Sequence, residues 1–450
     1  MPAPASDRDR VLVLLKRHGW NSTSFQLLEP EFQYWFADDD AAVAYTETRG
    51  AWVVGGGPIC AEARLAAVSH AFVEHARSRG RRVVFFGVEE RLLSAAPLRA
   101  LEIGQQPWWD PRRWHEVLAA RRSLRAQLRR ARAKGVSVEL LEPERIESAA
   151  SPLRKEIEAL IRAWLASREM PPMAFLVALA PFGHPRERIY VAARAGGTLV
   201  GLLVAVPVYD RAGWFFEDLL RDPSAPNGTS ELLVDAAMRE VASRGSGYVT
   251  LGLAPLAGVG GPLELARRMM AGFYSFDGVR AFKAKLGPDG WSPISLAVPA
   301  DASRWLAIVD ALDAFAGGSS VRFGLRAIVR APSFLLLWTA FAALAWATLL
   351  ALPFASRWFP SEAARWVWVA FDLAVALGLH RLSRSWSRGL GVTLASLLSL
   401  DAVATFAQAA MHNAPRATRP GDWLAIAIGC TAPALVSAIL WGGVARHGIK

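Results

Sequence analysis

The sequence predicts an α/β protein with mixed sheets and flanking helices, followed by an all-α transmembrane bundle. Three observations support this fold class. Short β-branched or aromatic runs alternate with helical patterns up to about residue 318. One strand–loop–helix–strand unit occurs twice in that part of the chain. Beyond it, uncharged apolar stretches exceed the roughly 20 residues needed to cross a bilayer.

The alternating patterns define the elements expected before the membrane part. Strands are expected at 42–48, 52–55, 82–88, 189–194, 199–208, 214–219 and 248–253. Helices are expected at 61–79, 111–134, 152–168, 230–244, 262–272 and 301–315. We divide the chain into a first domain at 1–145, a second domain at 146–318 that carries the candidate active site, and a membrane domain at 319–450.

The repeat appears when two segments are aligned. Arg49-Gly-Ala-Trp-Val-Val, a proline, a helix and Ser78-Arg-Gly-Arg-Arg-Val-Val match Arg211-Ala-Gly-Trp-Phe-Phe, a proline, a helix and Ser243-Arg-Gly-Ser-Gly-Tyr-Val. The copies differ after the tryptophan: the first reads Val-Val-Gly-Gly-Gly-Pro and the second reads Phe-Phe-Glu-Asp-Leu-Leu-Arg-Asp-Pro. We interpret the charged second copy as the working half and the first as structural.

Four membrane spans are expected, at 331–356, 362–380, 389–411 and 423–445. Asp372 and Asp401 fall within the second and third spans, where they serve either hydrogen bonding between helices or transport. Basic residues flank the spans unequally, eight on one side (Arg322, Arg326, Arg330, Arg381, Arg384, Arg388, Arg446, Lys450) and four on the other (Arg357, Arg365, Arg416, Arg419). The bias predicts a multi-pass protein of the cytoplasmic membrane whose N-terminal part and C-terminus face the cytoplasm.

Several other classes of site are not expected. Val11 to Leu15 is too short an apolar run for a signal peptide. Cys60 and Cys430 lie far apart, and the eight histidines have no ligand spacing, so neither a disulfide framework nor a metal site is predicted. No cofactor is expected.

The segment 112–134 is strongly basic, with nine lysines and arginines against a single acid, Glu116. Its local charge of +8 makes up most of the formal +11 of the chain. An ordinary solvated helix, the alternative, would mix charges of both signs. We predict a polyanion-binding surface for RNA phosphates or anionic lipid headgroups, which charge alone does not separate, formed by Arg121, Arg122, Arg125, Arg129 and Arg130.

Several runs together resemble a known family: His18-Gly-Trp-Asn-Ser-Thr-Ser, Ser123-Leu-Arg-Ala-Gln-Leu-Arg-Arg, Pro171-Pro-Met-Ala-Phe-Leu, Asp218-Leu-Leu-Arg, Leu251-Gly-Leu-Ala-Pro-Leu and Phe273-Tyr-Ser-Phe-Asp-Gly-Val-Arg-Ala-Phe-Lys-Ala-Lys-Leu. Over about residues 10–300 the chain is similar to the catalytic domain of the phosphatidylglycerol lysyltransferase (aminoacyl-phosphatidylglycerol synthase) family. Larger members carry a many-helix flippase before that domain, whereas here the predicted spans follow it.

The resemblance implies a fold and an activity. It implies two GNAT-type acyltransferase folds in tandem, which agrees with the repeat. It also implies transfer of an amino acid from aminoacyl-tRNA to the headgroup hydroxyl of phosphatidylglycerol. By the same resemblance, Asp218 and Arg221 fall on residues implicated in catalysis, and Lys283 and Lys285 fall on a basic segment near the lipid site.

Acyl transfer from an ester to an alcohol requires a base for the hydroxyl proton and a positive group for the developing oxyanion. Asp218 or Glu217 is expected to supply the base, and Arg221 the oxyanion contact or a bidentate grip on phosphate. Strand alternation places Glu217 and Asp218 on opposite faces, and we prefer Asp218 because it shares the Asp-x-x-Arg unit with Arg221. The alternative is an ion pair that closes a loop end.

A second candidate subsite follows this strand. Asn227-Gly228-Thr229-Ser230 starts a helix, with Thr229 or Ser230 as the cap, and its free N–H groups attract an anion. The Arg/Gln-x-x-Gly-x-Gly/Ala loop that holds the pyrophosphate of acetyl-CoA in GNAT enzymes is not found there, which favours a tRNA-borne donor. The glycines at 258–261 are expected to form a flexible loop, and a further basic group is expected near the bilayer to hold lipid phosphate (Arg267, Arg268, Arg280, Lys283, Lys285).

Three hypotheses result. The first is a membrane-anchored aminoacyltransferase that uses aminoacyl-tRNA and an anionic phospholipid. The second is a GNAT N-acyltransferase that uses acyl-CoA on a lipid or peptide amine. The third is a non-catalytic lipid-binding scaffold. The transferred amino acid and the acceptor lipid are not specified by these patterns.

Overall fold

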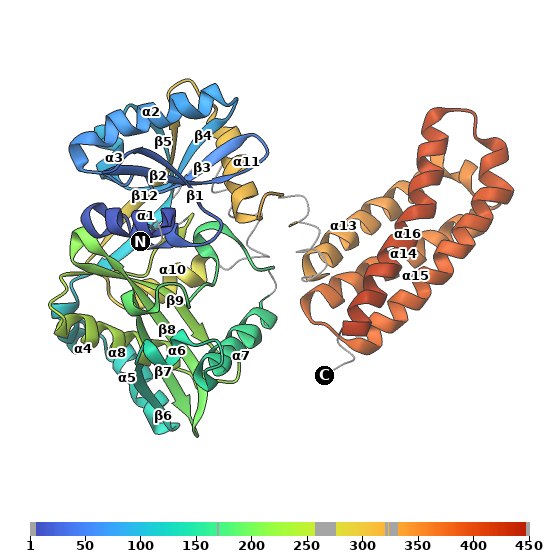
Figure 1. Ribbon diagram of the computed structural model, residues 1–450. Helices are drawn as coiled ribbons and strands as arrows, with labels where there is room; N and C mark the ends of the chain where they lie inside the picture. Colours follow the sequence, from blue (N-terminus) through green and yellow to red (C-terminus); the bar gives the residue numbers. More distant parts are fainter. Residues whose placement is uncertain (1–5, 169–170, 257–275, 320–322, 324–331, 447–450) are drawn as a thin grey trace. The chain divides into compact units, whose positions relative to one another are not determined.

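The computed structural model describes residues 6–168, 171–256, 276–319, 323 and 332–446. The chain forms two compact units, Met1–Phe323 and Gly324–Lys450, which are described separately. The first unit contains the sheet and the second contains only helices (Figure 1).

The first unit is built on a sheet of 12 strands in the order β1-β2-β3-β4-β12-β5-β10-β9-β8-β7-β6, with β11 paired to β5. We call β1–β4 the N-terminal half-sheet and β6–β10 the C-terminal half-sheet, and β5 and β12 join them. The strands are β1 (Gln33–Asp38), β2 (Ala41–Glu47), β3 (Ala51–Gly55), β4 (Arg82–Val88), β5 (Leu98–Trp109), β6 (Val136–Leu141), β7 (Ile189–Ala195), β8 (Thr198–Val208), β9 (Gly213–Arg221), β10 (Tyr248–Thr250), β11 (Ala254–Pro255) and β12 (Gly290–Pro299).

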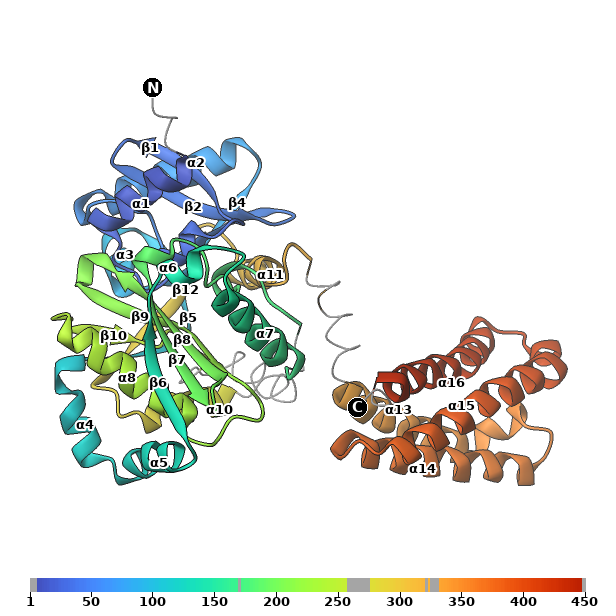
Figure 2. The same cartoon turned by 60° about the horizontal axis from the view of Figure 1, so that its bottom comes forward.

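Helices cover both faces of each half-sheet (Figures 1 and 2). On the N-terminal half-sheet, α2 (Leu65–Ser78) packs on one face, and α1 (Asp7–His18) and α11 (Arg304–Phe315) pack on the other. On the C-terminal half-sheet, α5 (Arg122–Ala133) and α8 (Thr229–Ser243) share one face, while α6 (Glu144–Glu147) and α7 (Pro152–Ala166) share the other. The remaining helices are α3 (Glu90–Ala95), α4 (Trp114–Ala120) and α10 (Phe276–Lys285).

The sequence repeat is also a structural repeat. The first copy is β3–α2–β4 and the second is β9–α8–β10, and each pair of strands is parallel. Trp52 lies opposite Val83 in the first copy, and Trp214 lies opposite Val249 in the second. In the sequence alignment Val83 corresponds to Tyr248, so the register of the second copy is shifted by one residue, although each tryptophan packs on the face covered by the helix of its own copy.

Some predicted elements differ from the structure. The helix predicted at 111–134 is divided into a 3-10 turn (Pro111–Arg113), α4 and α5, because the backbone leaves the helical region at Arg121 (φ −103, ψ 85). Strands β1, β5, β6, β11 and β12 were not predicted: β5 mixes charged and apolar residues, and β12 contains Pro293, which conceals its period. The helix predicted at 262–272 and the glycines at 258–261 lie outside the described residues.

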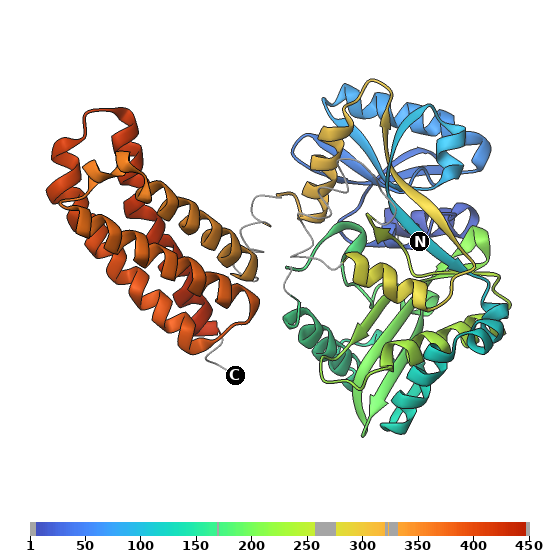
Figure 3. The same ribbon diagram turned by 180° about the vertical axis from the view of Figure 1, so that it is seen from behind.

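Strand β12 returns the chain to the N-terminal half-sheet. It pairs with β4 on one side and with β5 on the other, and α11 then packs on β3 and β4 (Figure 3). Arg82 of β4 holds α11 by donating to both carboxylate oxygens of Asp310, at 2.7 to 3.0 Å. The boundary at 145/146 between two soluble domains stays a prediction.

The second unit consists of α13 (Pro332–Ala351), α14 (Glu362–Arg384), α15 (Arg388–Gln408) and α16 (Pro420–Arg446). A 3-10 segment (Pro353–Trp358) follows α13, and a π-helical turn (Ala409–Asn413) follows α15. Three of its described helices, at 362–384, 388–416 and 420–445, are long and apolar enough to cross a membrane, whereas α13 is apolar over the shorter stretch Leu335–Ala351.

Candidate active site

The acidic stretch of β9 contains a β-bulge. Val204 of β8 pairs with Asp218 and Ala205 pairs with Phe216, so Glu217 has no partner residue in the ladder. A bulge changes the alternation of side chains at one point of a strand. The expectation that Glu217 and Asp218 point to opposite faces is therefore wrong: Phe216 and Leu219, which flank them, both pack in the core under α8, so both acids lie on the other face.

Arg188 precedes β7 and is the centre of a buried charged cluster. Its side chain is 1% exposed, its Nη1 donates to Glu217, and its Nη2 donates to Glu29 at 3.1 Å. Its Nε donates to the carbonyl of Gly183 at 2.7 Å, and the guanidinium lies 5.0 Å from the ring centre of Phe25. Glu29 follows the first 3-10 turn of the chain, so the cluster connects this N-terminal segment with β7 and β9.

Asp218 is the least satisfied member of this cluster. It is 5% exposed, and its Oδ2 is buried without a hydrogen-bond partner among the residues described. It aligns with Val204 and Tyr190 across three strands, on the face covered by α7. Burial, and then the charge of Glu217, raise the pKa of Asp218 well above its usual range, while Arg188 opposes the rise.

The pKa of the Glu29 carboxyl is also raised. Burial raises its pKa to about 7, with Arg188 acting in the opposite direction. Three carboxyls thus share one guanidinium in a water-poor region, where full ionisation would leave uncompensated negative charge. Carboxyls with strongly perturbed pKa values are concentrated at functional sites, because such shifts prepare them to exchange protons near neutral pH.

Arg221 lies on the other face of β9. Leu220 belongs to the core under α7 and Leu219 to the core under α8, so alternation directs Arg221 toward α8. Arg221 pairs with Gly201, whose Cα faces Thr229 and Leu233 of α8. Asp218 and Arg221 therefore do not meet, although they share one sequence motif.

The first turn of α8 differs from the sequence expectation. Gly228, in the left-handed region at φ +97, is the N-cap, and no side chain caps this helix. Thr229 is buried and donates its hydroxyl to the carbonyl of Pro226 at 2.7 Å, so the prediction that Thr229 or Ser230 caps the helix is wrong. Asn227 is exposed beside this turn. A Cβ at Gly228 would lie 2.3 Å from the carbonyl oxygen of Gln127, which shows how closely α5 approaches this turn.

The basic residues of α10 are not gathered at a free surface. Lys283 is buried and its Nζ donates to the carbonyls of Gly252 and Leu253 at 2.8 Å each; desolvation lowers its pKa to about 7. Lys285 binds Glu231 of α8 at 2.6 Å. Arg280 is exposed and lies 5.5 Å from the ring centre of Trp291. The expectation that all three project toward lipid phosphate is wrong for Lys283, and Arg267 and Arg268 lie outside the described residues.

The basic segment is divided into paired and unpaired arginines. Arg112 and Arg113 bind Asp110 and Glu116. Arg125 donates to backbone carbonyls of α4, and Arg130 makes a long contact of 3.4 Å with Gln127. Arg121, Arg122 and Arg129 are exposed, and their side chains make no hydrogen bond or ion pair with any part of the chain that the structure describes. Figure 2 shows α4 and α5 along one border of the C-terminal half-sheet.

Strand β9 has an incompletely paired edge. Strand β10 pairs only with Gly213–Phe215, so from Phe216 to Arg221 no described strand pairs with β9 on that side. Backbone N–H and C=O groups need partners. This edge begins at the bulge and therefore offers hydrogen-bonding groups close to Asp218.

Arg188 and Glu29 were not identified from the sequence. Arg188 lies 29 residues before Glu217, and Glu29 lies 189 residues before Asp218. No local spacing links either of them to the acidic stretch. The only available signal was the position of Arg188 directly before an apolar run, where a charged residue has to be either exposed or paired.

Comparison with known proteins supports the sequence resemblance. Residues 12–298 match the family model described as phosphatidylglycerol lysyltransferase, C-terminal. A Nocardia farcinica bifunctional protein of lysylphosphatidylglycerol biosynthesis is 28% identical over 200 residues, which is 43% of this chain and 17% of that protein. An uncharacterised Corynebacterium glutamicum protein is 24% identical over 310 residues, 63% of this chain and 38% of its own length. The chain thus spans well under half of either relative.

Two solved structures share the fold of the first unit. One is assigned as the C-terminal domain of a lysylphosphatidylglycerol synthetase from Agrobacterium fabrum, with a TM-score of 0.60, 24% identity, and coverage of 70% of this chain and 97% of that chain. The other is L-PGS from Bacillus licheniformis, with a TM-score of 0.60, 20% identity, and coverage of 71% and 98%. The predicted fold class, tandem GNAT-like domains followed by an all-α bundle, is confirmed. The chain belongs to the family of phosphatidylglycerol lysyltransferase C-terminal domains.

Proposed function

We propose that this protein transfers an amino acid from aminoacyl-tRNA to the headgroup hydroxyl of an anionic phospholipid such as phosphatidylglycerol. The observation that carries the proposal is the carboxyl of Asp218, buried at a bulge of β9 with an oxygen that has no partner among the described residues. A carboxyl in this state is prepared to accept a proton from a substrate hydroxyl. Family membership supplies the class of reaction.

The proposed reaction is an ester exchange. The lipid hydroxyl oxygen attacks the carbonyl carbon of the aminoacyl ester as ionised Asp218 takes the hydroxyl proton. The new ester C–O bond forms, the bond to the terminal ribose oxygen of the tRNA breaks, and that oxygen receives the proton from Asp218. The raised pKa of Asp218 makes its ionised form a stronger base than an ordinary aspartate. Glu217 and Arg188 are positioning residues that fix the bulge.

Arg221 and the first turn of α8 are proposed to hold an anionic part of a substrate. The side chain of Arg221 makes no hydrogen bond or ion pair with the described residues, and it projects toward a helix N-terminus, which attracts negative charge. Its place on the opposite face of β9 from Asp218 favours a phosphate contact over a contact with the reacting carbonyl. Asn227, exposed beside this turn, is included in the subsite.

The basic segment supports the proposal that aminoacyl-tRNA is the donor. Arg121, Arg122 and Arg129 present unpaired cations on α5 and at its start, and α5 packs against Gly228 at the start of α8. RNA phosphates release counterions when such cations bind them, which makes the affinity dependent on salt. We assign this surface to the tRNA body and the lipid to another face.

That other face is formed by α11. Its residues Trp305, Leu306, Val309 and Leu312 are exposed and lie on one side of the helix, whereas Ala307, Ala311 and Ala314 are buried on the other. An amphipathic helix with exposed tryptophan and leucine lies in the interfacial region of a bilayer. The first apolar helix, α13, begins at Pro332, soon after α11 ends at Phe315.

The membrane part is proposed to be multi-pass, with the soluble unit and the C-terminus in the cytoplasm. The excess of basic residues before α13, between α14 and α15 and after α16 supports this orientation. It would place the soluble unit in the compartment that contains aminoacyl-tRNA.

The test is a cell-free assay with the purified full chain, phosphatidylglycerol vesicles, a tRNA fraction and labelled amino acids with their synthetases. A labelled lipid is expected, and it should disappear after RNase treatment. If labelling survives RNase treatment and requires acyl-CoA, the protein would instead be a GNAT N-acyltransferase. If no labelled product forms, and Asp218→Ala and Arg221→Ala have no effect in cells, the protein would instead be a non-catalytic lipid-binding scaffold.

A further inference from the structure

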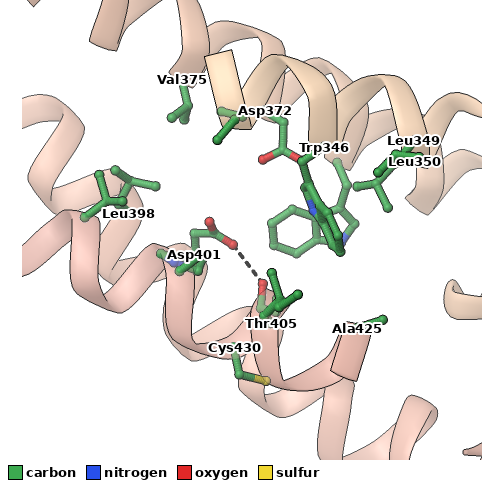
Figure 4. Close-up of a pocket in the computed structure, with 18 of the residues that line it drawn as sticks. Trp346, Leu349, Leu350, Asp372, Val375, Leu398, Asp401, Thr405, Ala425 and Cys430 are labelled. Carbon is green, nitrogen blue, oxygen red and sulfur yellow. Dashed lines mark hydrogen bonds between the residues drawn. The ribbon is translucent and has the colours of Figure 1, made fainter. Parts of the chain in front are cut away.

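The helical unit contains a cavity that the proposed transfer reaction does not use. It has a volume of about 430 Å³ and is lined by residues from α13, α14, α15 and α16 (Figure 4). Ligand sites typically measure about 300–1,000 Å³. Its walls are mainly apolar, with Leu349, Leu350, Val375 and Leu398 among the lining residues.

Two carboxylates from different helices face this cavity. Asp372 of α14 and Asp401 of α15 both line it, and Figure 4 shows both carboxyls directed toward the space between the helices. Asp401 is 7% exposed, and its Oδ1 accepts a hydrogen bond from Thr405 of the same helix at 2.8 Å. The carboxyl of Asp372 makes no hydrogen bond or ion pair with any residue that the structure describes.

These contacts bear on the alternatives for the two acids. The hydrogen bonds between helices, expected as one alternative, are not present at either aspartate within the described bundle. No described lysine or arginine lines the cavity. The protein therefore does not compensate these carboxylates, although acids within membrane helices are costly and normally have partners.

Two amide side chains also line the cavity: one is held by hydrogen bonds, and the other presents a further hydrogen-bond acceptor. Gln408 accepts a hydrogen bond from Trp368 Nε1 and donates to the carbonyl of Trp358, each at 3.0 Å. Asn413, in the π-helical turn after α15, also lines the cavity, and its Oδ1 is buried without a hydrogen-bond partner among the described residues. Single π-helical turns occur frequently at functional sites, and a buried acceptor without a donor indicates that a donor is missing.

The chemistry of the lining identifies the ligand class. Carboxylates and an amide oxygen accept hydrogen bonds, and Trp346, Trp358 and Trp368 offer indole rings, the surfaces that attract organic cations most strongly. The described residues contain no group of three metal-ligating side chains, and the cavity is far larger than a single ion requires. We propose that this cavity binds the ammonium group of an amphiphilic organic cation, with its apolar part against the leucine-rich wall.

Such an ammonium group has two possible sources, a lipid headgroup or a water-soluble amine. The shared chemistry is a positively charged nitrogen between two carboxylates and indole rings. The proposal does not depend on the transfer reaction, because the cavity and its lining belong to the helical unit alone.

The test uses the purified full chain in dodecyl maltoside micelles and native mass spectrometry to count bound molecules. The probes are dodecyltrimethylammonium, tetramethylammonium and dodecanol. One dodecyltrimethylammonium ion is expected to bind, with dodecanol bound at least roughly tenfold more weakly, which corresponds to about 1.4 kcal/mol. Binding of the dodecyl cation alone supports a lipid source, whereas equal binding of tetramethylammonium would overturn the role given to the apolar wall and leave a site for a small soluble amine.

Variants connect the binding to the two acids. Asp372→Asn and Asp401→Asn preserve side-chain shape, and each is expected to weaken dodecyltrimethylammonium binding roughly tenfold. Asp422→Asn is the matched control, because Asp422 already binds Arg357 and does not line the cavity. Equal binding of dodecanol, or full affinity in the Asp372→Asn/Asp401→Asn double variant with an unchanged melting temperature, would overturn the proposal and leave a cavity for acyl chains.

Discussion

Arg188 donates a hydrogen bond to Glu217 from the segment that precedes β7, and both side chains are more than nine-tenths buried. The contact stabilises the bulge that turns Asp218 toward α7. Because Glu29 binds the same guanidinium, the N-terminal segment is part of the site. The structural role of the cluster and the chemical role of Asp218 therefore have to be tested with separate measurements.

Replacing Asp218 with asparagine should reduce the rate of aminoacyl transfer about 100-fold or more, because the variant lacks the proposed base. In the wild type, activity should fall as the pH decreases through the raised pKa of Asp218, so the acid limb should lie above the range of an ordinary aspartate. Initial rates across pH measure this. An acid limb at the usual aspartate range would contradict the assignment, and Asp222→Asn, in the following exposed turn, is the matched control.

Glu29→Gln should change the pH dependence of stability. A carboxyl whose folded pKa is raised binds its proton more tightly in the folded protein, so stability falls as the pH rises from its unfolded value of 4.5 to about 7. Removal of this carboxyl should make the decline shallower in that window. Thermal unfolding of the full chain in detergent at pH 5 and pH 8 measures the slope. A variant with the wild-type slope would show that Glu29 keeps an ordinary pKa.

Arg121→Gln, Arg122→Gln and Arg129→Gln should weaken the use of the tRNA-borne donor, because these guanidinium groups are exposed and form no ion pair with the described part of the chain. Each change should raise the KM for aminoacyl-tRNA and reduce the dependence of log KM on log salt by about 1. Arg112→Gln and Arg113→Gln are controls, since these residues already bind Asp110 and Glu116. Equal effects in both groups would contradict a specific surface on α5.

Trp305→Asn combined with Val309→Asn should lower binding of the full chain to lipid. Burying each of these side chains in the interface contributes about 1.5–3 kcal/mol, so a loss of roughly tenfold or more in transfer to vesicle lipid is expected. Transfer to a water-soluble glycerophosphate acceptor should change little. Leu140→Asn is the control, because Leu140 is an exposed apolar residue on β6. Equal losses with both acceptors would indicate damage to the fold.

Gly228→Ala should destabilise the junction between α5 and α8 by about 1–3 kcal/mol, because a Cβ would lie 2.3 Å from a backbone oxygen at a left-handed φ. Gly245→Ala is the matched control, with φ +81 and no atom within 4 Å of the added Cβ. Melting temperatures of the two variants separate steric clash from backbone strain. A smaller loss at Gly228 than at Gly245 would contradict the close packing of α5 on α8.

Local patterns predicted the elements that have a clear period. The strand at 82–88 is as expected, the helix expected at 152–168 ends two residues earlier, and the repeat recurs as two parallel strand–helix–strand units. Strands β5 and β12 were not predicted because their pairing stabilises them more than their composition does. The division of the basic helix at Arg121 was not visible either, since arginine does not mark a helix end in sequence.

The sequence by itself determined the fold class, the two copies of the α/β unit, the basic segment, the apolar helices and the family, because each is recorded in the order and spacing of residues. Only the tertiary structure decided which charged groups meet. It brought Glu29 and Arg188 to Glu217 and Asp218, directed Arg221 to the opposite face, and buried Lys283 against carbonyls. The physical reason is that a one-residue bulge and long-range strand pairing determine side-chain direction, and neither has a local signal in the sequence.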